Sequence, residues 1–212
     1  MLPSIQNWFH HLRVVFAALL ILRSGFAGAA EFADGSDEYQ QKAARICGFL
    51  NHVEWPKRKF LAPDTPFIVG IYGTDQISEF LREAVQSRQV KGRSVQVRAI
   101  ADLAEIPSCH VLFVSRSETD RVRKILAEAR REGVLTVGES QEFTRSGGVV
   151  QFVTVAEKVI YLVDRTNASR EGLRLDGFML RFSDPKQLTN DNADAKTNRR
   201  LAEKPTPLKA DP

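Results

Sequence analysis

The chain has 212 residues, which is enough for one domain of ordinary size with additional segments at its ends. Its 30 basic and 26 acidic residues give a formal net charge of +4 at pH 7. This near balance argues against a nucleic acid as the partner, because phosphate binding needs clustered positive charge.

Residues 1–29 have the pattern of a secretory signal peptide. Nine apolar residues at 14–22 follow Arg13, and small residues then lead to Ala27-Gly28-Ala29. This Ala-x-Ala pattern marks a cleavage site, and nine apolar residues are too few to span a bilayer, which takes about 20. We expect export, with cleavage near Ala29. Loss of Arg13 and Arg23 lowers the basic count from 30 to 28 against 26 acidic residues, a net charge of +2.

The first element after a linker at 30–37 is an amphipathic helix within 37–56. Its apolar residues recur at spacings of 4, 3, 4 and 3, the stripe of one helix face: Tyr39, Ala43, Ile46, Leu50 and Val53. Pro56 is expected to end the helix, because proline disfavours helical geometry in the residue before it.

The next segments alternate between strand and helix patterns. Short β-rich runs occur at 66–73, 94–100, 111–115 and 134–138. Helical spacing occurs at 76–87, where Thr74 or Asp75 can cap the start, and again after Ser117, with a stop at Gly133. Strand, helix and strand in this order predict parallel βαβ units.

The last part of the predicted domain changes character. Two apolar runs at 147–153 and 158–163 are separated by four residues, which predicts an antiparallel hairpin. An amphipathic piece follows at 167–182, and residues 184–212 are polar and proline-containing, which predicts a disordered tail. The fold prediction is a single α/β, Rossmann-like domain at 38–183, with a mostly parallel sheet flanked by helices and a terminal hairpin.

The titratable residues form no catalytic or metal-binding pattern. His52 and Glu54 are two positions apart and would point to different sides of a helix, and the adjacent Cys109 and His110 would point to opposite faces of a strand. No Gly-x-Ser-x-Gly nucleophile motif is present. We therefore expect no catalytic residue, metal or cofactor. Export would permit a disulfide between Cys47 and Cys109, although buried free cysteines are also common core residues.

Three other features are candidates for contact with a ligand or partner. Gly73, Thr74 and Asp75 form a turn between a strand and a helix, where backbone N–H groups can bind an anion. Trp55 stands where the first helix ends, and is either a core anchor or an exposed partner contact. The densest basic group alternates with acids, which favours a solvated helix face over an anion site: Arg121, Arg123, Lys124, Arg130 and Arg131.

The order of these motifs resembles the YfiR family of exported bacterial proteins. The resemblance begins at the helix that ends in Val53-Glu54-Trp55-Pro56 and includes the strand and turn at 67–75 and the segment at 109–117. It continues through 134–139 and the hairpin to Gly172-Leu173, and so covers roughly residues 38–182.

The resemblance implies a non-catalytic periplasmic regulator that represses a membrane signalling protein, such as a diguanylate cyclase, by engaging its periplasmic part. A homodimer is a further expectation. Two other classes stay open at this point. A periplasmic small-ligand module would use the turn at Gly73–Asp75, because α/β folds bind ligands beyond the carboxyl ends of their strands. An enzyme of another type would need a cleft that gathers Asp75, His110 and Asp164.

Overall fold

The structure is a computed structural model that describes residues 33–181, and the side chains of residues 36–180. The chain divides into two compact units, Met1–Glu38 and Tyr39–Pro212. Only the opening turns of helix α2 are described in the first unit, so the fold below concerns the second. The predicted signal peptide and the predicted tail at 184–212 lie outside the described residues.

A seven-stranded sheet forms the centre of the second unit, in the order β3-β4-β2-β5-β6-β7-β8. Its middle strands pair in parallel, as the alternation of strand and helix patterns predicts. These strands are β2 (Phe67–Tyr72), β4 (Arg93–Ile100), β5 (Val111–Val114) and β6 (Leu135–Gly138). The chain leaves β2 toward β4 on one side and returns to β5 on the other, so β2 and β5 flank the topological switch point.

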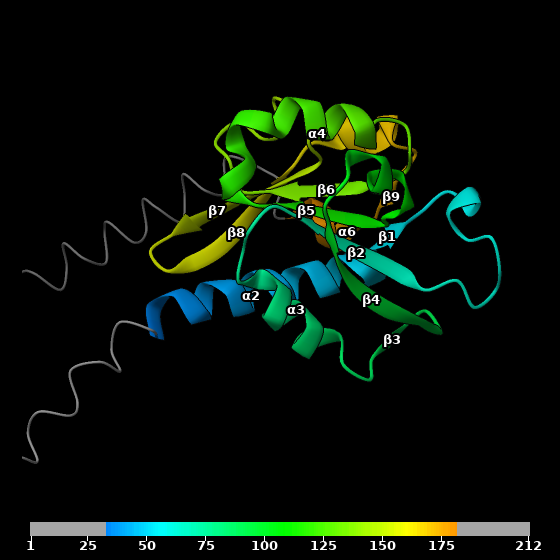
Figure 1. Ribbon diagram of the computed structural model, residues 1–212, viewed down its shortest axis with the longest axis horizontal. Helices are drawn as coiled ribbons and strands as arrows, with labels where there is room; N and C mark the ends of the chain where they lie inside the picture. Colours follow the sequence, from blue (N-terminus) through cyan, green and yellow to red (C-terminus); the bar gives the residue numbers. More distant parts are fainter. Residues whose placement is uncertain (1–32, 182–212) are drawn as a thin grey trace, which may run out of the picture. The chain divides into compact units, whose positions relative to one another are not determined.

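Helices cover both faces of the sheet, which confirms the predicted α/β architecture (Figure 1). Helices α2 (Ala33–His52, from Tyr39 onward) and α3 (Ile77–Val85) pack on one face, with Ile46, Leu50 and Leu81 at 0% exposure. Helix α4 (Val122–Ala129) packs on the other face through Ile125, also at 0%. Since successive residues of β2 and β5 point to opposite faces, each strand contributes to both apolar layers.

The predicted hairpin consists of β7 (Val150–Val155) and β8 (Lys158–Val163), which pair antiparallel. Its two-residue turn has positive φ at Ala156 (46°) and Glu157 (64°). Positive φ at both positions is typical of tight hairpin turns, which usually have Asn-Gly there. Strand β7 pairs in parallel with β6 and continues the sheet. At the opposite edge, the short strand β3 (Gln89–Val90) pairs antiparallel with β4, a feature that the sequence patterns did not predict.

The helix predicted within 37–56 begins earlier and ends earlier. It starts at Ala33, inside the predicted linker at 30–37, and ends at His52. Val53 and Glu54 then form strand β1, which pairs antiparallel with β9 (Arg174–Leu175). Val53 is nevertheless buried in the core at 0% exposure. Although it belongs to β1, its side chain continues the apolar stripe of α2.

The amphipathic piece predicted at 167–182 is not one helix. It comprises α5 (Arg165–Arg170), β9 and α6 (Gly177–Arg181). The break follows from Gly172, whose φ of +73° is the left-handed conformation that commonly ends a helix. The N–H of Leu173 then bonds to the carbonyl of Ala168, which turns the chain toward β1.

Three short 3₁₀ segments complete the connections: η1 (Lys57–Lys59), η2 (Leu103–Ser108) and η3 (Arg116–Arg121). Asp102 and Glu105 form a capping box at the start of η2. The cap predicted at Ser117 belongs instead to Ser115, whose hydroxyl oxygen accepts a hydrogen bond from Ser117 N at 3.3 Å. In the described part of the chain, no helix is long and apolar enough to cross a membrane.

Gly138 and Gly148 enclose the fully buried ring of Phe143, which lies in the connection between β6 and β7. A Cβ atom at Gly148 would overlap this ring, whereas a Cβ at Gly48 in α2 would meet no atom within 4 Å. We therefore predict that Gly148→Ala lowers the free energy of unfolding by about 1–3 kcal/mol, because overpacking displaces the ring. Gly48→Ala should raise it by roughly 0.5–1 kcal/mol through helix propensity. Urea unfolding measures both. A Gly148→Ala protein as stable as the unsubstituted chain would contradict the packing described.

Candidate functional site

The turn at Gly73–Asp75 lies at the switch point between β2 and β5, as its position in the sequence suggests. Its polar groups are already engaged within the protein. Thr74 N donates to Ser117 Oγ at 3.1 Å, and Asp75 Oδ1 accepts from Ile77 N at 2.9 Å, which starts α3. A Cβ atom at Gly73 would lie 2.7 Å from Ser117 Oγ, so η3 fills the space above the turn. The N–H of Thr74, one of the donors expected to bind an anion, is therefore occupied by a protein side chain.

Trp55 is a core residue and not an exposed partner contact, since only 8% of its surface is accessible. Its indole Nε1 donates to the carbonyl oxygen of His110 at 2.9 Å. Its ring lies edge-on to Phe67, with the ring centroids 5.3 Å apart. The partner contact that the sequence allowed at Trp55 is thus replaced by an anchor between the end of β1 and the start of β5.

His110 is buried and holds a structural position. Its Nδ1 accepts a hydrogen bond from Ile68 N at 3.1 Å, so the ring must carry its proton on Nε2. Nε2 has no hydrogen-bond partner among the described residues, and the ring is tilted against that of Phe60, with the ring centroids 4.8 Å apart. Burial, reinforced by the charge of Lys59, lowers the pKa of His110 to about 4. A histidine held neutral in this way serves as an acceptor for the backbone and does not reach a cleft.

Cys47 and Cys109 are both free and buried, so the disulfide considered from the sequence is absent from this structure. The physical reason is their placement on opposite faces of the sheet. Cys47 belongs to the apolar layer beneath α2, and Cys109 to the layer beneath α4. Burial raises the pKa of both thiols, which lowers their reactivity.

His52 and Glu54 do not form a metal site, and no cluster of metal ligands occurs within the described residues. Each has a partner on the segment around β9 instead. His52 Nδ1 lies 2.6 Å from Asp176 Oδ2, and Glu54 Oε2 lies 3.5 Å from Arg174 Nε. Burial opposes ionisation of Asp176 slightly, but hydrogen bonds from His52 and from backbone N–H groups hold its pKa below the usual value. These pairs secure the short strand pair of β1 and β9.

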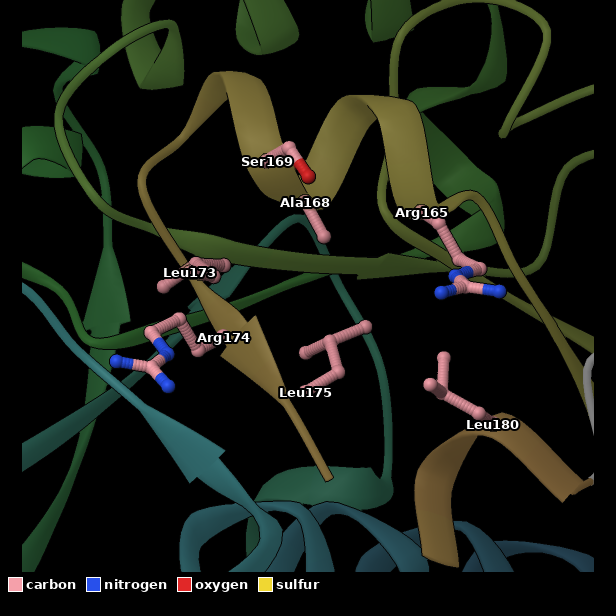
Figure 2. A pocket seen from close by; sticks show the side chains of 7 residues that line it. All are labelled: Arg165, Ala168, Ser169, Leu173, Arg174, Leu175 and Leu180. Carbon is pink, nitrogen blue, oxygen red and sulfur yellow. The ribbon is translucent and has the colours of Figure 1, made fainter. Parts of the chain in front are cut away.

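Three adjoining cavities surround β9 and α6, and we name the area that they form the C-terminal surface. The first has a volume of about 250 Å³ and lies beneath α5. In Figure 2, Ala168, Leu175 and Leu180 point into one space, with Arg165 and Arg174 at its two ends. An apolar centre bordered by arginines is typical of protein-binding patches.

The other two cavities extend this surface along α2. One of about 380 Å³ shares Arg174 and Leu175 with the first, and includes His52. The next, of about 430 Å³, is mostly apolar and also includes His52; it is lined by Gln41, Ala44, Arg45, Gly48, Phe49, Tyr161 and Phe178. Phe178 is 49% exposed and stacks on His52 with the ring centroids 4.3 Å apart. A large, half-exposed aromatic beside an apolar groove offers a strong anchor for a protein partner.

Sequence reasoning did not identify this surface, because it treated 167–182 as one helix. Gly172 carried a usable signal, since glycine commonly follows the last turn of a helix. Recognition of that stop would have separated Leu175 and Phe178 from the helix that precedes Gly172. The pairing of β9 with β1, which is only two residues long, has no comparable signal in the sequence.

The environment of His110 predicts a loss of stability in acid. Its pKa is depressed in the folded chain to about 4 from an ordinary value of 6.5, so the folded state resists protonation more than the unfolded state does. Its contribution is complete above pH 6.5 and is lost as the pH falls toward 4, by about 2 kcal/mol at pH 4.5. Urea unfolding at pH 7.0 and 4.5 measures this loss. His110→Asn keeps an acceptor without a titratable group and should lose less stability; an equal loss in both proteins would contradict the assignment.

The chain is similar in sequence to a known protein family. A sequence model of the YfiR/HmsC-like family, DUF4154, matches residues 39–184. None of the curated proteins is significantly similar to the chain. A solved structure, described as a conserved domain protein from Vibrio cholerae O1 biovar El Tor, is similar with a TM-score of 0.47 and 11% identity; the match covers 68% of this chain and 58% of that chain. The family match extends over the whole described domain, and the chain therefore belongs to the YfiR/HmsC-like family.

Proposed function

We propose that the chain is a non-catalytic periplasmic regulator that binds and represses a membrane signalling protein, such as a diguanylate cyclase. Membership of the YfiR/HmsC-like family over residues 39–184 is the observation that carries the proposal. The predicted signal peptide supports a periplasmic location. A regulator in the periplasm can change the level of cytoplasmic cyclic di-GMP only through a protein that crosses the membrane.

The chemistry of the described residues supports a binding role over a catalytic one. His110 is neutral and accepts a hydrogen bond from the backbone, and both cysteines are buried with raised pKa values. Asp75 is bound to the start of α3. The residues that an enzyme hypothesis would recruit thus hold the fold together. The C-terminal surface, with Phe178 half exposed, is the better candidate for contact with the partner.

The small-ligand alternative has less support. It depended on backbone donors at Gly73–Asp75, and Thr74 N already donates to Ser117 Oγ. A ligand would have to displace η3 before it could reach the turn.

Deletion of the gene should raise cytoplasmic cyclic di-GMP, measured by mass spectrometry, and expression of the full chain from a plasmid should restore the lower level. Unchanged cyclic di-GMP in a strain shown to express its membrane cyclases would contradict the proposal.

Substitutions on the C-terminal surface should weaken repression without unfolding the protein. Phe178→Ser removes the half-exposed aromatic, and Gly48→Gln projects a side chain into open space above the apolar groove. Loss of an aromatic anchor typically weakens binding by about 1–2 kcal/mol or more. The matched control is Leu61→Ser, because Leu61 is 93% exposed and lies outside this surface. Full repression by Phe178→Ser and Gly48→Gln would exclude the C-terminal surface as the contact.

A further inference from the structure

A second hollow lies between α4, the connection from β6 to β7, and α5. It has a volume of about 530 Å³ and is bordered by four guanidinium groups. They belong to Arg123 of α4, Arg130 just after the end of α4, Arg145 of the connection, and Arg170 of α5. We name it the arginine groove. Its size lies within the range of ligand sites.

The floor of the arginine groove is held in place by Asn167, which is 6% exposed. Its Nδ2 donates to the carbonyl oxygens of Thr144 at 2.9 Å and Gly148 at 2.8 Å, so α5 and the connection are joined. Its Oδ1 accepts from Arg170 Nη1 at 2.9 Å, which orients that guanidinium. The groove is therefore formed before any partner arrives, which lowers the entropic cost of binding.

The rim of the groove has unused positive charge. Arg123 and Arg130 are exposed, and among the described side chains neither forms an ion pair. The sequence suggested that the basic residues of this region are neutralised by neighbouring acids, which holds for Arg121, paired with Glu118 at 3.1 Å. Arg123 and Arg130 instead line the groove together with Arg145 and Arg170.

The floor, by contrast, holds a buried acid. Glu171 is 6% exposed, lines the groove, and has one carboxylate oxygen, Oε2, that is buried with no hydrogen-bond partner among the described residues. Burial raises the pKa of Glu171, and backbone N–H groups at Arg131 and Gly133 oppose that shift. Asp164, the other acid of the groove, is engaged by Asn167 N at 2.8 Å. The two acids of the groove are thus buried or engaged, and an occupant meets mainly the positive charge of the rim.

We propose that the arginine groove binds an extended acidic segment of the regulator's protein partner. Carboxylates of such a segment match the guanidinium forks. Arg123 and Arg130 are two helical turns apart, about 10.5 Å, the span of about three extended residues. This inference rests on the proposed function, since it assumes that the partner is a protein.

A peptide titration tests the groove directly. The probe is a fluorescein-labelled acetyl octapeptide with four glutamates, added to the mature chain from residue 30 onward, with fluorescence anisotropy as the readout. We expect saturable binding that the glutamine version of the peptide does not show. The double variant Arg123→Gln/Arg130→Gln should bind about tenfold or more weakly, because two charge-assisted contacts are lost.

The matched control is Arg82→Gln/Lys124→Gln, which removes the same charge from exposed positions outside the groove. It should change the affinity less than about twofold. Equal weakening in both double variants, or stronger competition by inorganic phosphate or phosphatidylglycerol vesicles than by unlabelled peptide, would overturn the inference. Thermal unfolding of each variant checks its folding, and Arg145→Gln provides an independent exposed substitution in the groove.

The outcome is separable from that of the proposed function. If the acidic peptide fails to bind while the chain still lowers cyclic di-GMP in cells, only the groove assignment is wrong. If deletion leaves cyclic di-GMP unchanged, the regulator proposal fails whatever the peptide does.

Discussion

The hydrogen bond from the indole of Trp55 to the carbonyl of His110 fixes the chain that leaves α2 against the amino end of β5. Lys59 strengthens the same junction, with its ammonium 2.6 Å from the carbonyl oxygen of Pro107 and 2.7 Å from that of Cys109. Because this segment follows α2 directly, the anchor sets how that helix covers the sheet and where β1 lies. Strand β1 in turn receives β9 and thereby positions the C-terminal surface.

The same junction contains His110 and Cys109, two residues of types that often take part in catalysis. His110 must stay neutral to accept from Ile68 N, and Cys109 packs beneath α4. The two proposed contact surfaces lie on either side of α5. Arg165, Ala168 and Ser169 line the cavity of the C-terminal surface, whereas Thr166, Asn167 and Arg170 line the arginine groove. A protein partner that presents apolar and acidic side chains together could contact both surfaces across this short helix.

Sequence patterns predicted the central βαβ units and the hairpin, because long apolar runs and helical stripes report burial directly. They did not predict β1, β9 or the break at Gly172, since two-residue strands depend on a partner far away in the chain. Trp55 illustrates the same limit. The sequence places it at the end of the first helix, but its burial depends on contacts with Phe67 and His110. The arginine groove could not be predicted from the sequence either, because the fold brings Arg123 and Arg130 close to Arg170, which is distant in the chain.

Direct titration of the mature chain with a purified periplasmic portion of a membrane diguanylate cyclase from the same genome tests the central claim. Isothermal titration calorimetry should give saturable binding with a dissociation constant of about 1 μM or lower, which corresponds to roughly 8 kcal/mol. The account would be contradicted by the absence of binding at about 100 μM to every such cyclase portion that the genome encodes.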